Sequence, residues 1–497
     1  MLCLTLNGAT MQENYATLAQ NEPYIQILEL RIDTLNLNDP KQIEEATQFP
    51  SHTKIPVILT CRRKTDSGEF SQSERKRLSL LKQVSQGAFS YVDLEANVRK
   101  PDFEAQLRMQ GKKIIRSFHL FDGLKDNLDV KISHIMAKGD IPKVAVQIDG
   151  VAALVELFRF ADRFKGKGNI IIIGMGKYGI ASRVLYKKLG SMLTFCAAKD
   201  PQGVGLINAK TMSQLYRADQ VTENTRVYGV IGDPVGKSIS PAIQNLAIQA
   251  ITEDAIYVPF NVDDVTQFFV LASILNIQGF SVTVPHKVHV LPYLGKTSRE
   301  VRRIGSCNTA LRQEKTWYGS NTDYYGFLEL IKSPLEAGKI KNALVLGAGG
   351  GARAIVWALR NHNVNITILN RTLEHAKALA TETSSAFGSL SDVGKYSGKV
   401  DLIVQTSSMG MDCSQDSEND PAKDFCYTGS ELVCDLVYRP QETAFLLHAK
   451  QAGCKLIYGL DMLLAQGKLQ FKAFTGENYP QEITIESIKT IAQTCIF

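Results

Sequence analysis

The sequence predicts an α/β protein in which an N-terminal (β/α)8 barrel is followed by two smaller α/β lobes, the second of them Rossmann-type. Three observations predict this fold class. Short β-rich runs alternate with helix-length segments over the first 200 residues. A polar stretch at 217–226, RADQVTENTR, then resembles a linker, and near residue 341 a strand, a glycine-rich turn and a helix follow one another. Because a usual domain has roughly 100–200 residues, about three folding units are expected in 497 residues.

Composition limits the class of protein. Hydrophobic residues make up 44% of the chain and charged residues 21%, which is enough for ordinary cores. The net charge of +6 is mild for this length, so it suits small anionic ligands better than nucleic acid. None of the nine cysteines forms a C-x-x-C pair, and no apolar run reaches the roughly 18 residues that cross a bilayer. We expect a reduced cytoplasmic protein with no nucleic-acid partner, no membrane partner and no metal.

The first half, residues 1–220, contains eight strand candidates. They are LCLTL from Leu2, IQILELRID from Ile25, IPVILTC from Ile55, YVDLEA from Tyr91, KKIIRSFH from Lys112, PKVAVQI from Pro142, NIIIIGM from Asn169 and MLTFCA from Met192. Helical stretches such as VAALVELFRFADRF separate them. This alternation predicts a closed parallel barrel, which takes about 200–250 residues.

The second half divides at the glycine-rich turn. Residues 227–335 begin with the strand VYGVIG and predict a substrate-binding lobe. Residues 336–455 predict a nucleotide-binding lobe. The largely helical end, 456–497, is expected to return to the first of these two lobes.

Charged residues alternate with aliphatic ones inside the barrel strands. Side chains two positions apart share a face, so Glu29, Arg31 and Asp33 point the same way, and so do Asp93 and Glu95. In a barrel they face the core near the C-terminal mouth, where such folds carry out their chemistry. Buried ion pairs are an equally good interpretation of these residues.

Lys143 lies in the strand PKVAVQI among aliphatic neighbours. An inward lysine there is expected to be desolvated, which favours the neutral amine, a nucleophile that can form a Schiff base. A structural lysine is the alternative, although lysine is rarely buried without a reason. His119, near the end of the preceding strand, could serve as acid and base or be structural.

A formal G-x-G-x-x-G motif, Gly174, Gly176 and Gly179, follows the seventh strand. A dinucleotide site would need a partner strand that ends in an acidic residue about 20 residues further on, and none is clear here. Because the barrel also needs this strand as its seventh, a nucleotide site is the less favoured interpretation.

A stronger nucleotide motif opens the Rossmann-type lobe. Its glycines, between the strand ALVL and the helix ARAIVWALR, are Gly347, Gly349, Gly350 and Gly351. They permit a tight turn and a close approach of a pyrophosphate to the helix N-terminus. The next strand ends in Asn370, Arg371 and Thr372, where an NAD site usually has Asp or Glu. The guanidinium of Arg371 suits a 2′-phosphate, which predicts NADP. A glycine-rich turn that binds nothing is the alternative.

Four strand-to-turn segments before this motif carry hydroxyl, amide or charged groups, as sites for small polar ligands do. They are YGVIGDPVGKSISPAIQN from Tyr228, GFSVTVPHK from Gly279, GSCNTA from Gly305 and GSNTDYYG from Gly319. Lys287 and Asp323 could pair to hold or pass a proton, and a surface ion pair is equally consistent with the sequence.

Seven segments of the first half occur in a recognisable order and approximate spacing: ELRID, TCRR…DSGE, YVDLE, SFHLF, IPKVA, MGKYGIASR and LTF. Over residues 1–216 they resemble type I 3-dehydroquinate dehydratase. The resemblance implies that Lys143 forms an imine with the ketone of 3-dehydroquinate. His119 would remove the neighbouring C–H proton and then protonate the departing hydroxyl, which gives 3-dehydroshikimate. Arg183 would hold the substrate carboxylate, and the substrate hydroxyls would contact Glu29, Arg31 and Arg62.

Two positions depart from that family. Asp66 stands where the family usually has a glutamate that orients the histidine, so its reach is one methylene shorter. The loop KDPQGVG, at 199–205, replaces the usual Ser-Ala-Pro-Gly-Gln and lacks its Ser and Gln contacts.

The four segments of the second half, with NRTLEHAKALA, DLVYRPQETAFLLHAKQAG and GLDMLLAQG after them, resemble shikimate dehydrogenase. The resemblance implies that Lys287 and Asp323 are the acid–base pair beside the carbon that exchanges a hydride with the nicotinamide. The residues it assigns to substrate binding are Ser238, Ser240, Thr283, Asn308 and Gln466. Lys237 and Ser281 depart from the family, which often has His and Asn there.

The product expected of the first site is the substrate expected of the second, and the fused order resembles bifunctional dehydroquinate dehydratase–shikimate dehydrogenase. We therefore predict dehydration of 3-dehydroquinate followed by NADPH-dependent reduction of 3-dehydroshikimate to shikimate. Two alternatives are a quinate/shikimate dehydrogenase with relaxed cofactor choice and a non-catalytic metabolite-sensing relative. A sensor should have lost its catalytic groups, and all four (Lys143, His119, Lys287 and Asp323) are present.

Overall fold

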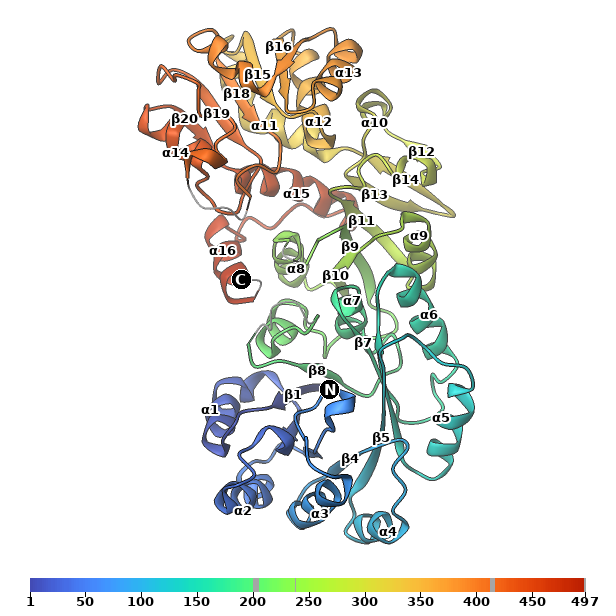
Figure 1. Ribbon diagram of the computed structural model, residues 1–497. Coiled ribbons are helices and arrows are strands. Elements are labelled where there is room, and N and C mark those ends of the chain that lie inside the picture. Colours follow the sequence, from blue (N-terminus) through green and yellow to red (C-terminus); the bar gives the residue numbers. More distant parts are fainter. Residues whose placement is uncertain (200–204, 237, 412–415, 496–497) are drawn as a thin grey trace.

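The computed structural model describes residues 1–199, 205–236, 238–411 and 416–495. Figure 1 shows an elongated molecule with a barrel at one end, a second sheet in the middle and a third sheet at the other end. Each sheet is accompanied by helices, so the predicted α/β fold class is confirmed. Within the described residues, no helix is both long enough and apolar enough to span a membrane.

The barrel consists of eight parallel strands in the order β7-β6-β5-β4-β3-β2-β1-β8. Their bounds are β1 (Leu2–Leu6), β2 (Ile27–Arg31), β3 (Val57–Thr60), β4 (Tyr91–Glu95), β5 (Lys113–Leu120), β6 (Ile141–Gln147), β7 (Ile171–Met175) and β8 (Thr194–Cys196). The ring nearly closes between its two end strands, where the Met192 amide donates a hydrogen bond to the Ile170 carbonyl at 2.8 Å.

Helices surround the barrel on the outside. They are α1 (Met11–Asn21), α2 (Pro40–Gln48), α3 (Glu74–Val84), α4 (Pro101–Met109), α5 (Leu128–Ala137), α6 (Val151–Asp162) and the short α7 (Ile180–Val184). Local sequence sets their starts: α2, for example, begins where the Asp39 carboxylate accepts from the Lys41 amide and a proline follows at the first helical position. After β8 comes one helical turn, Thr211–Leu215.

The second sheet has the strand order β10-β9-β11-β13-β14-β12. Its strands are β9 (Arg226–Gly232), β10 (Ala255–Asn261), β11 (Ile277–Val282), β12 (Lys296–Thr297), β13 (Thr309–Gln313) and β14 (Thr316–Ser320). β9, β10 and β11 are parallel, whereas β13 pairs antiparallel with both β11 and β14. The helices of this region are α8 (Ser240–Ala250), α9 (Val265–Ile274), α10 (Arg299–Ile304) and α11 (Thr322–Glu336).

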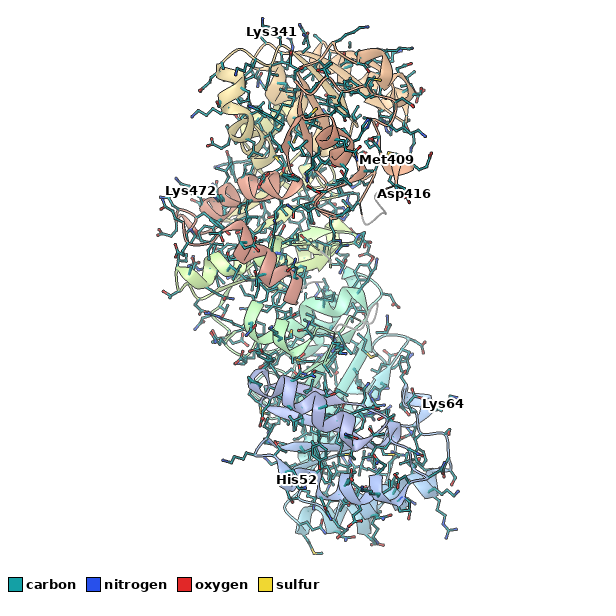
Figure 2. All side chains as sticks on the ribbon, turned by 90° about the vertical axis from the view of Figure 1, so that its left-hand side faces the viewer. His52, Lys64, Lys341, Met409, Asp416 and Lys472 are labelled. Carbon is teal, nitrogen blue, oxygen red and sulfur yellow. The ribbon has the colours of Figure 1, made fainter. Side chains whose placement is uncertain are left out.

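The third sheet is parallel throughout, in the order β17-β16-β15-β18-β19-β20. Its strands are β15 (Asn342–Leu346), β16 (Asn365–Asn370), β17 (Ala386–Ser389), β18 (Leu402–Gln405), β19 (Leu432–Asp435) and β20 (Lys455–Ile457). Its helices are α12 (Gly350–Arg360), α13 (Leu373–Thr383) and α14 (Ala444–Gln451). In Figure 2, Lys341 lies at the far end of this region and Met409 lies nearer the second sheet.

The last two helices return along the molecule. α15 (Gly459–Thr475) packs against α11 and α8, and α16 (Ile485–Cys495) packs against α8 and the turn at 211–215. The polar stretch at 217–226 is not a free linker, because Ala218, Val221 and Thr225 within it are buried. One apolar core runs without a break from the barrel into the second sheet, whereas the third sheet has separate cores on its two faces.

Candidate active sites

The first candidate site lies at the carboxyl ends of the barrel strands and is centred on Lys143 of β6. The Lys143 ammonium lies 3.3 Å from Glu29 and 3.2 Å from Asp93, and 4.2 Å above the centre of the Phe195 ring. Its side chain is buried, as strand alternation predicts. Its surroundings are mixed: Ile141 and Ala145 share its face of β6, Val144 and Val146 face the other way, and neighbouring strands add carboxylates to the barrel interior.

Arg62 joins these carboxylates into a buried network. Its guanidinium donates to Asp93 at 2.8 Å, to Glu95 at 3.1 Å and to the Ser117 hydroxyl at 2.8 Å. Burial alone would raise the pKa of Asp93, but the charges of Arg62 and Lys143 lower it well below its usual range. Arg31 forms a two-point pair with Asp33 at 2.9 and 2.6 Å. The carboxylates on the barrel strands therefore form buried ion pairs in this structure, as the ion-pair interpretation predicts.

His119 lies on β5 beside this network. Ser117 is the register partner of Lys143, and His119 is two residues further along the same strand face. Burial, followed by the charges of Arg62 and Lys143, lowers the pKa of His119 to about 2, so its imidazole is neutral. A neutral imidazole can accept a proton.

The Nδ1 atom of His119 is buried and has no hydrogen-bond partner. The nearest oxygen of Asp66 lies 3.9 Å away, which is too far for a hydrogen bond. The other oxygen of Asp66 accepts from Arg63 at 2.8 Å. Asp66 therefore makes no hydrogen bond to His119 in this structure. A cavity of about 590 Å3 opens beside it, with Asp66, Ser117 and His119 in its wall.

Arg183, on α7, differs from the other barrel arginines. It is buried, its Nε has no hydrogen-bond partner, and within the described part of the chain no carboxylate pairs with it. Burial lowers the pKa of Arg183 to about 10. A buried cation without a partner is costly, and an anionic ligand would remove that cost. The formal glycine motif before it leads into a helix of only five residues.

The second candidate site lies where strands of the second sheet end. The Asp233 amide, just after β9, donates to the Val284 carbonyl, just after β11, at 3.2 Å. This brings the segment with Ser238 and Ser240 to the same sheet edge as Thr283 and Lys287. Because β13 is antiparallel to β11, Asn308 at its start lies at that edge too.

Lys287 and Asp323 form a close ion pair here. Their ammonium and carboxylate are 2.6 Å apart, and their side chains are only 17% and 12% exposed. A pair this buried is not an ordinary surface ion pair. A side chain on Gly350, at the start of α12, would have its Cβ 3.1 Å from the Lys287 Cβ. The glycine-rich turn of the third sheet therefore lies directly against the ion pair of the second.

Amide and hydroxyl side chains form a hydrogen-bond network that includes Thr322, the residue before Asp323. The Asn308 side-chain amide donates to Thr322 at 2.9 Å and to Gln466 at 3.4 Å. Ser281 is buried and tied into the sheet: it accepts from the Tyr257 hydroxyl at 2.6 Å and donates to Gln470 at 2.8 Å.

The glycine-rich turn has the geometry of a nucleotide-binding turn. Gly347 has φ +115°, and a Cβ on it would come within 2.4 Å of the Thr406 hydroxyl, so only glycine fits. A Cβ on Gly349 would meet no heavy atom within 4 Å, which leaves room for a ligand. At the end of β16, Asn370 donates to the Thr372 carbonyl at 2.8 Å, and Arg371 is exposed.

Sequence reasoning missed several residues of both sites. Arg77 of α3 is fully buried and reaches Glu95 at 2.9 Å, and the Phe195 ring covers Lys143. In the second site, Thr322 and Gln470 complete the hydrogen-bond network. Thr322 lies within the GSNTDYYG segment, whose polar run was a usable signal. Lys237 and most of the 199–205 loop lie outside the described residues.

Three family models match the chain in succession. The type I 3-dehydroquinase model matches residues 2–223. The shikimate dehydrogenase substrate binding domain matches residues 230–310, and the shikimate / quinate 5-dehydrogenase model matches residues 329–424.

Two curated relatives agree with these matches. A bifunctional 3-dehydroquinate dehydratase/shikimate dehydrogenase of Arabidopsis thaliana is 29% identical over 482 residues, which cover 92% of this chain and 79% of that protein. A shikimate dehydrogenase (NADP(+)) of Caldanaerobacter subterraneus is 36% identical over 279 residues, 54% of this chain and 99% of that protein. The solved shikimate dehydrogenase of Aquifex aeolicus is 34% identical, with a TM-score of 0.48, and the match covers 53% of this chain and 98% of that one. The chain therefore belongs to the shikimate dehydrogenase family and, through its type I 3-dehydroquinase half, to the bifunctional 3-dehydroquinate dehydratase/shikimate dehydrogenases.

Proposed function

We propose that this chain catalyses two consecutive reactions, the dehydration of 3-dehydroquinate to 3-dehydroshikimate and the NADPH-dependent reduction of 3-dehydroshikimate to shikimate. One observation carries the proposal: each half brings a lysine of low exposure close to a second side chain that can exchange protons. In the barrel it is Lys143 with the neutral His119, and in the second half it is Lys287 with Asp323. The named activities of the relatives support it.

In the first reaction, the Lys143 amine attacks the substrate ketone, and loss of water gives an iminium. Glu29, 3.3 Å from the nitrogen, can take up the proton that the ammonium must release. The neutral His119 removes the neighbouring C–H proton, and the iminium accepts the electron pair. His119 then gives its proton to the departing hydroxyl, and water hydrolyses the imine to release product and amine. Arg183, which lacks an anionic partner in the described barrel, binds the substrate carboxylate.

In the second reaction, Lys287 donates a proton to the oxygen that becomes the alkoxide. Asp323 holds the ammonium in place at 2.6 Å and takes part in its reprotonation. Ser238, Ser240, Thr283, Asn308 and Gln466 bind the carboxylate and hydroxyls of the substrate. When bound, NADPH supplies the hydride.

The residues of the third sheet fit this cofactor. Gly347, Gly349, Gly350 and Gly351 give the pyrophosphate access to the N-terminus of α12. Arg371, with Asn370 and Thr372 beside it, binds the 2′-phosphate. In the described part of the chain no carboxylate pairs with Arg371, so its guanidinium is available to a phosphate.

We assign residues 1–220 to the dehydratase barrel, 227–335 with 456–497 to the substrate-binding lobe, and 336–455 to the NADP-binding lobe. We further propose a cytoplasmic location, which the seven free cysteines of the described residues support, and 3-dehydroquinate and 3-dehydroshikimate as small-molecule partners.

A coupled assay tests the proposal. With 3-dehydroquinate and NADPH as the only reactants, the wild type should consume NADPH, because its first site supplies the substrate of its second. Lys143→Ala should consume none from 3-dehydroquinate but should still consume it from added 3-dehydroshikimate. If the wild type leaves NADPH unchanged with either substrate, the proposed function is wrong.

A further inference from the structure

The glycine loop at 174–179 of the barrel has no role in the two reactions described above, yet its conformation is tightly specified. Gly176 has φ +81°, and a Cβ on Gly179 would lie 2.5 Å from the Gly174 carbonyl carbon. The Ser182 hydroxyl accepts from the Gly174 amide at 3.0 Å and donates to the Gly179 carbonyl at 2.6 Å. These contacts fold the loop back on itself and direct Lys177 and Tyr178 away from the barrel.

Lys177 and Tyr178 reach the second sheet. The Lys177 ammonium lies 2.8 Å from one oxygen of Asp233, and the Tyr178 hydroxyl donates to the other at 3.1 Å. Figure 1 shows the barrel's β7 and α7 close to β10 of the second sheet, and α7 packs against β10. Both oxygens of a carboxylate just after β9 are thus bound by the barrel.

Asn261, the last residue of β10, makes a second connection. Its side chain is buried, donates to the Lys177 carbonyl at 2.9 Å and accepts from the Val235 amide at 3.0 Å. The Val235 carbonyl in turn accepts from the Ser238 amide at 3.0 Å, and the Ser238 hydroxyl accepts from the Ser240 amide at 3.2 Å. A continuous chain of hydrogen bonds therefore runs from the barrel loop to the two serines.

The adjoining surfaces keep this arrangement in place. The Asp263 carboxylate accepts from the Val151 amide at the start of α6, at 2.9 Å. α6 packs against α9, and the apolar core is continuous across the junction. The barrel loop is therefore held against the second sheet by packing on one side and by Asp233 and Asn261 on the other.

We propose that Lys177 and Tyr178 of the dehydratase barrel are positioning residues of the dehydrogenase: through Asp233 and Asn261 they fix the segment that presents Ser238 and Ser240 to the substrate carboxylate. The inference rests on the proposed dehydrogenase reaction and on the role given there to the two serines. Within the described residues, no hydrogen bond or ion pair joins the loop to Lys287 or to the glycine-rich turn, so the loop acts on substrate binding.

Steady-state oxidation of shikimate by NADP+ in the full-length protein tests this inference. Lys177→Met and Asp233→Ala should each raise the KM for shikimate by roughly three- to tenfold, as the loss of one coupled contact does. The double variant should show no more than the larger single effect, because both substitutions break the same connection. The kcat and the KM for NADP+ should stay at the wild-type values.

Three further variants complete the test. Lys177→Arg should keep the wild-type KM, because it can still pair with Asp233, and Tyr178→Phe should raise the KM by a smaller factor. Lys125→Met is the matched control, because Lys125 pairs with Asp122 within the barrel at 3.2 Å. An unchanged KM in both Lys177→Met and Asp233→Ala, or fully additive effects, would overturn the inference while leaving the proposed function intact. A wild type that does not oxidise shikimate would overturn the proposed function and the inference with it.

Discussion

The two candidate sites use charge in opposite ways. The barrel site is a network in which four cations, Lys143, Arg31, Arg62 and Arg77, pair with four carboxylates, Glu29, Asp33, Asp93 and Glu95, before any substrate arrives. The second site has one ion pair, Lys287 with Asp323, next to a network of neutral amides and hydroxyls at a junction of two sheets. In the barrel, the buried Arg183 has no carboxylate partner within the described residues, which is why we propose that it binds the anionic group of the substrate. In the second site, discrimination between substrates must come from amide and hydroxyl side chains that separate parts of the chain bring together.

Lys287→Met tests the single ion pair and should have the largest effect. It removes the proton donor of the second reaction, so kcat for shikimate oxidation should fall by about a hundredfold or more. The dehydratase rate should not change, because the barrel site contains no residue of the second half. Lys296→Met, which removes an exposed lysine from the same sheet, is the control. A dehydrogenase rate close to that of the wild type would exclude Lys287 as the donor.

Paired and unpaired arginines of the barrel should respond differently to removal of their charge. Arg62→Leu removes one of the two cations that pair with each of the buried carboxylates Asp93 and Glu95, so it should destabilise the protein by up to about 3–5 kcal/mol. Arg183→Leu breaks no ion pair in the described chain and should leave stability unchanged or raise it, while the KM for 3-dehydroquinate rises at least about tenfold. Urea unfolding measures the first effect and dehydratase kinetics the second. Equal losses of stability would contradict the contrast.

Arg371→Ala should reduce cofactor discrimination in the second half. Loss of a charge-assisted contact to the 2′-phosphate should raise the KM for NADPH by roughly tenfold and leave the KM for NADH almost unchanged. Lys377→Ala, on the adjacent exposed face of α13, should change neither value. A wild type that prefers NADH would show that Arg371 does not select the cofactor.

His119 should make the barrel less stable in acid. Its pKa is about 2 in the folded protein, against about 6.5 in an unfolded chain. Between these values the unfolded state binds a proton that the folded state does not, so stability falls as the pH drops below about 6.5. His119→Gln should remove up to about 1.4 kcal/mol of this loss for each pH unit. The measurement is urea unfolding at pH 7, 6 and 5.

His52→Gln is the matched control for this pH dependence, because His52 is exposed on the barrel surface (Figure 2). It should lose stability in acid as the wild type does. A His119→Gln variant that loses as much stability in acid as the wild type would contradict a neutral, buried His119.

The contrast between the sites also explains what could be predicted from the sequence. In a parallel barrel, strand alternation alone decides which side chains face inward, so Lys143, Asp93 and Glu95 were placed correctly. The partners of these groups come from neighbouring strands, and alternation along one strand says nothing about them. The helix that begins at Glu74 has three basic residues in its first turns, and nothing in that pattern shows that Arg77 is the one that turns inward.

In the second half, motif segments indicated which residues matter but not how they connect. Tyr257, Ser281 and Gln470 form one hydrogen-bonded row from β10, β11 and α15, although Ser281 and Gln470 are 189 residues apart. The contact between the barrel loop and Asp233 has the same character, because it depends on how two sheets pack. The Asp66 carboxylate has two neighbours, Arg63 and His119, and it pairs with Arg63. No sequence pattern specifies which of the two it contacts.

The most direct test of the account is covalent trapping at Lys143. The wild type is treated with 3-dehydroquinate and sodium borohydride, and its intact mass and peptide masses are measured. The account predicts one reduced adduct per chain, located on the peptide that contains Lys143, and none on Lys143→Ala, while both proteins still oxidise shikimate. A wild type without an adduct, or an equal adduct on Lys143→Ala, would contradict the claim that this buried lysine is the nucleophile of the first site.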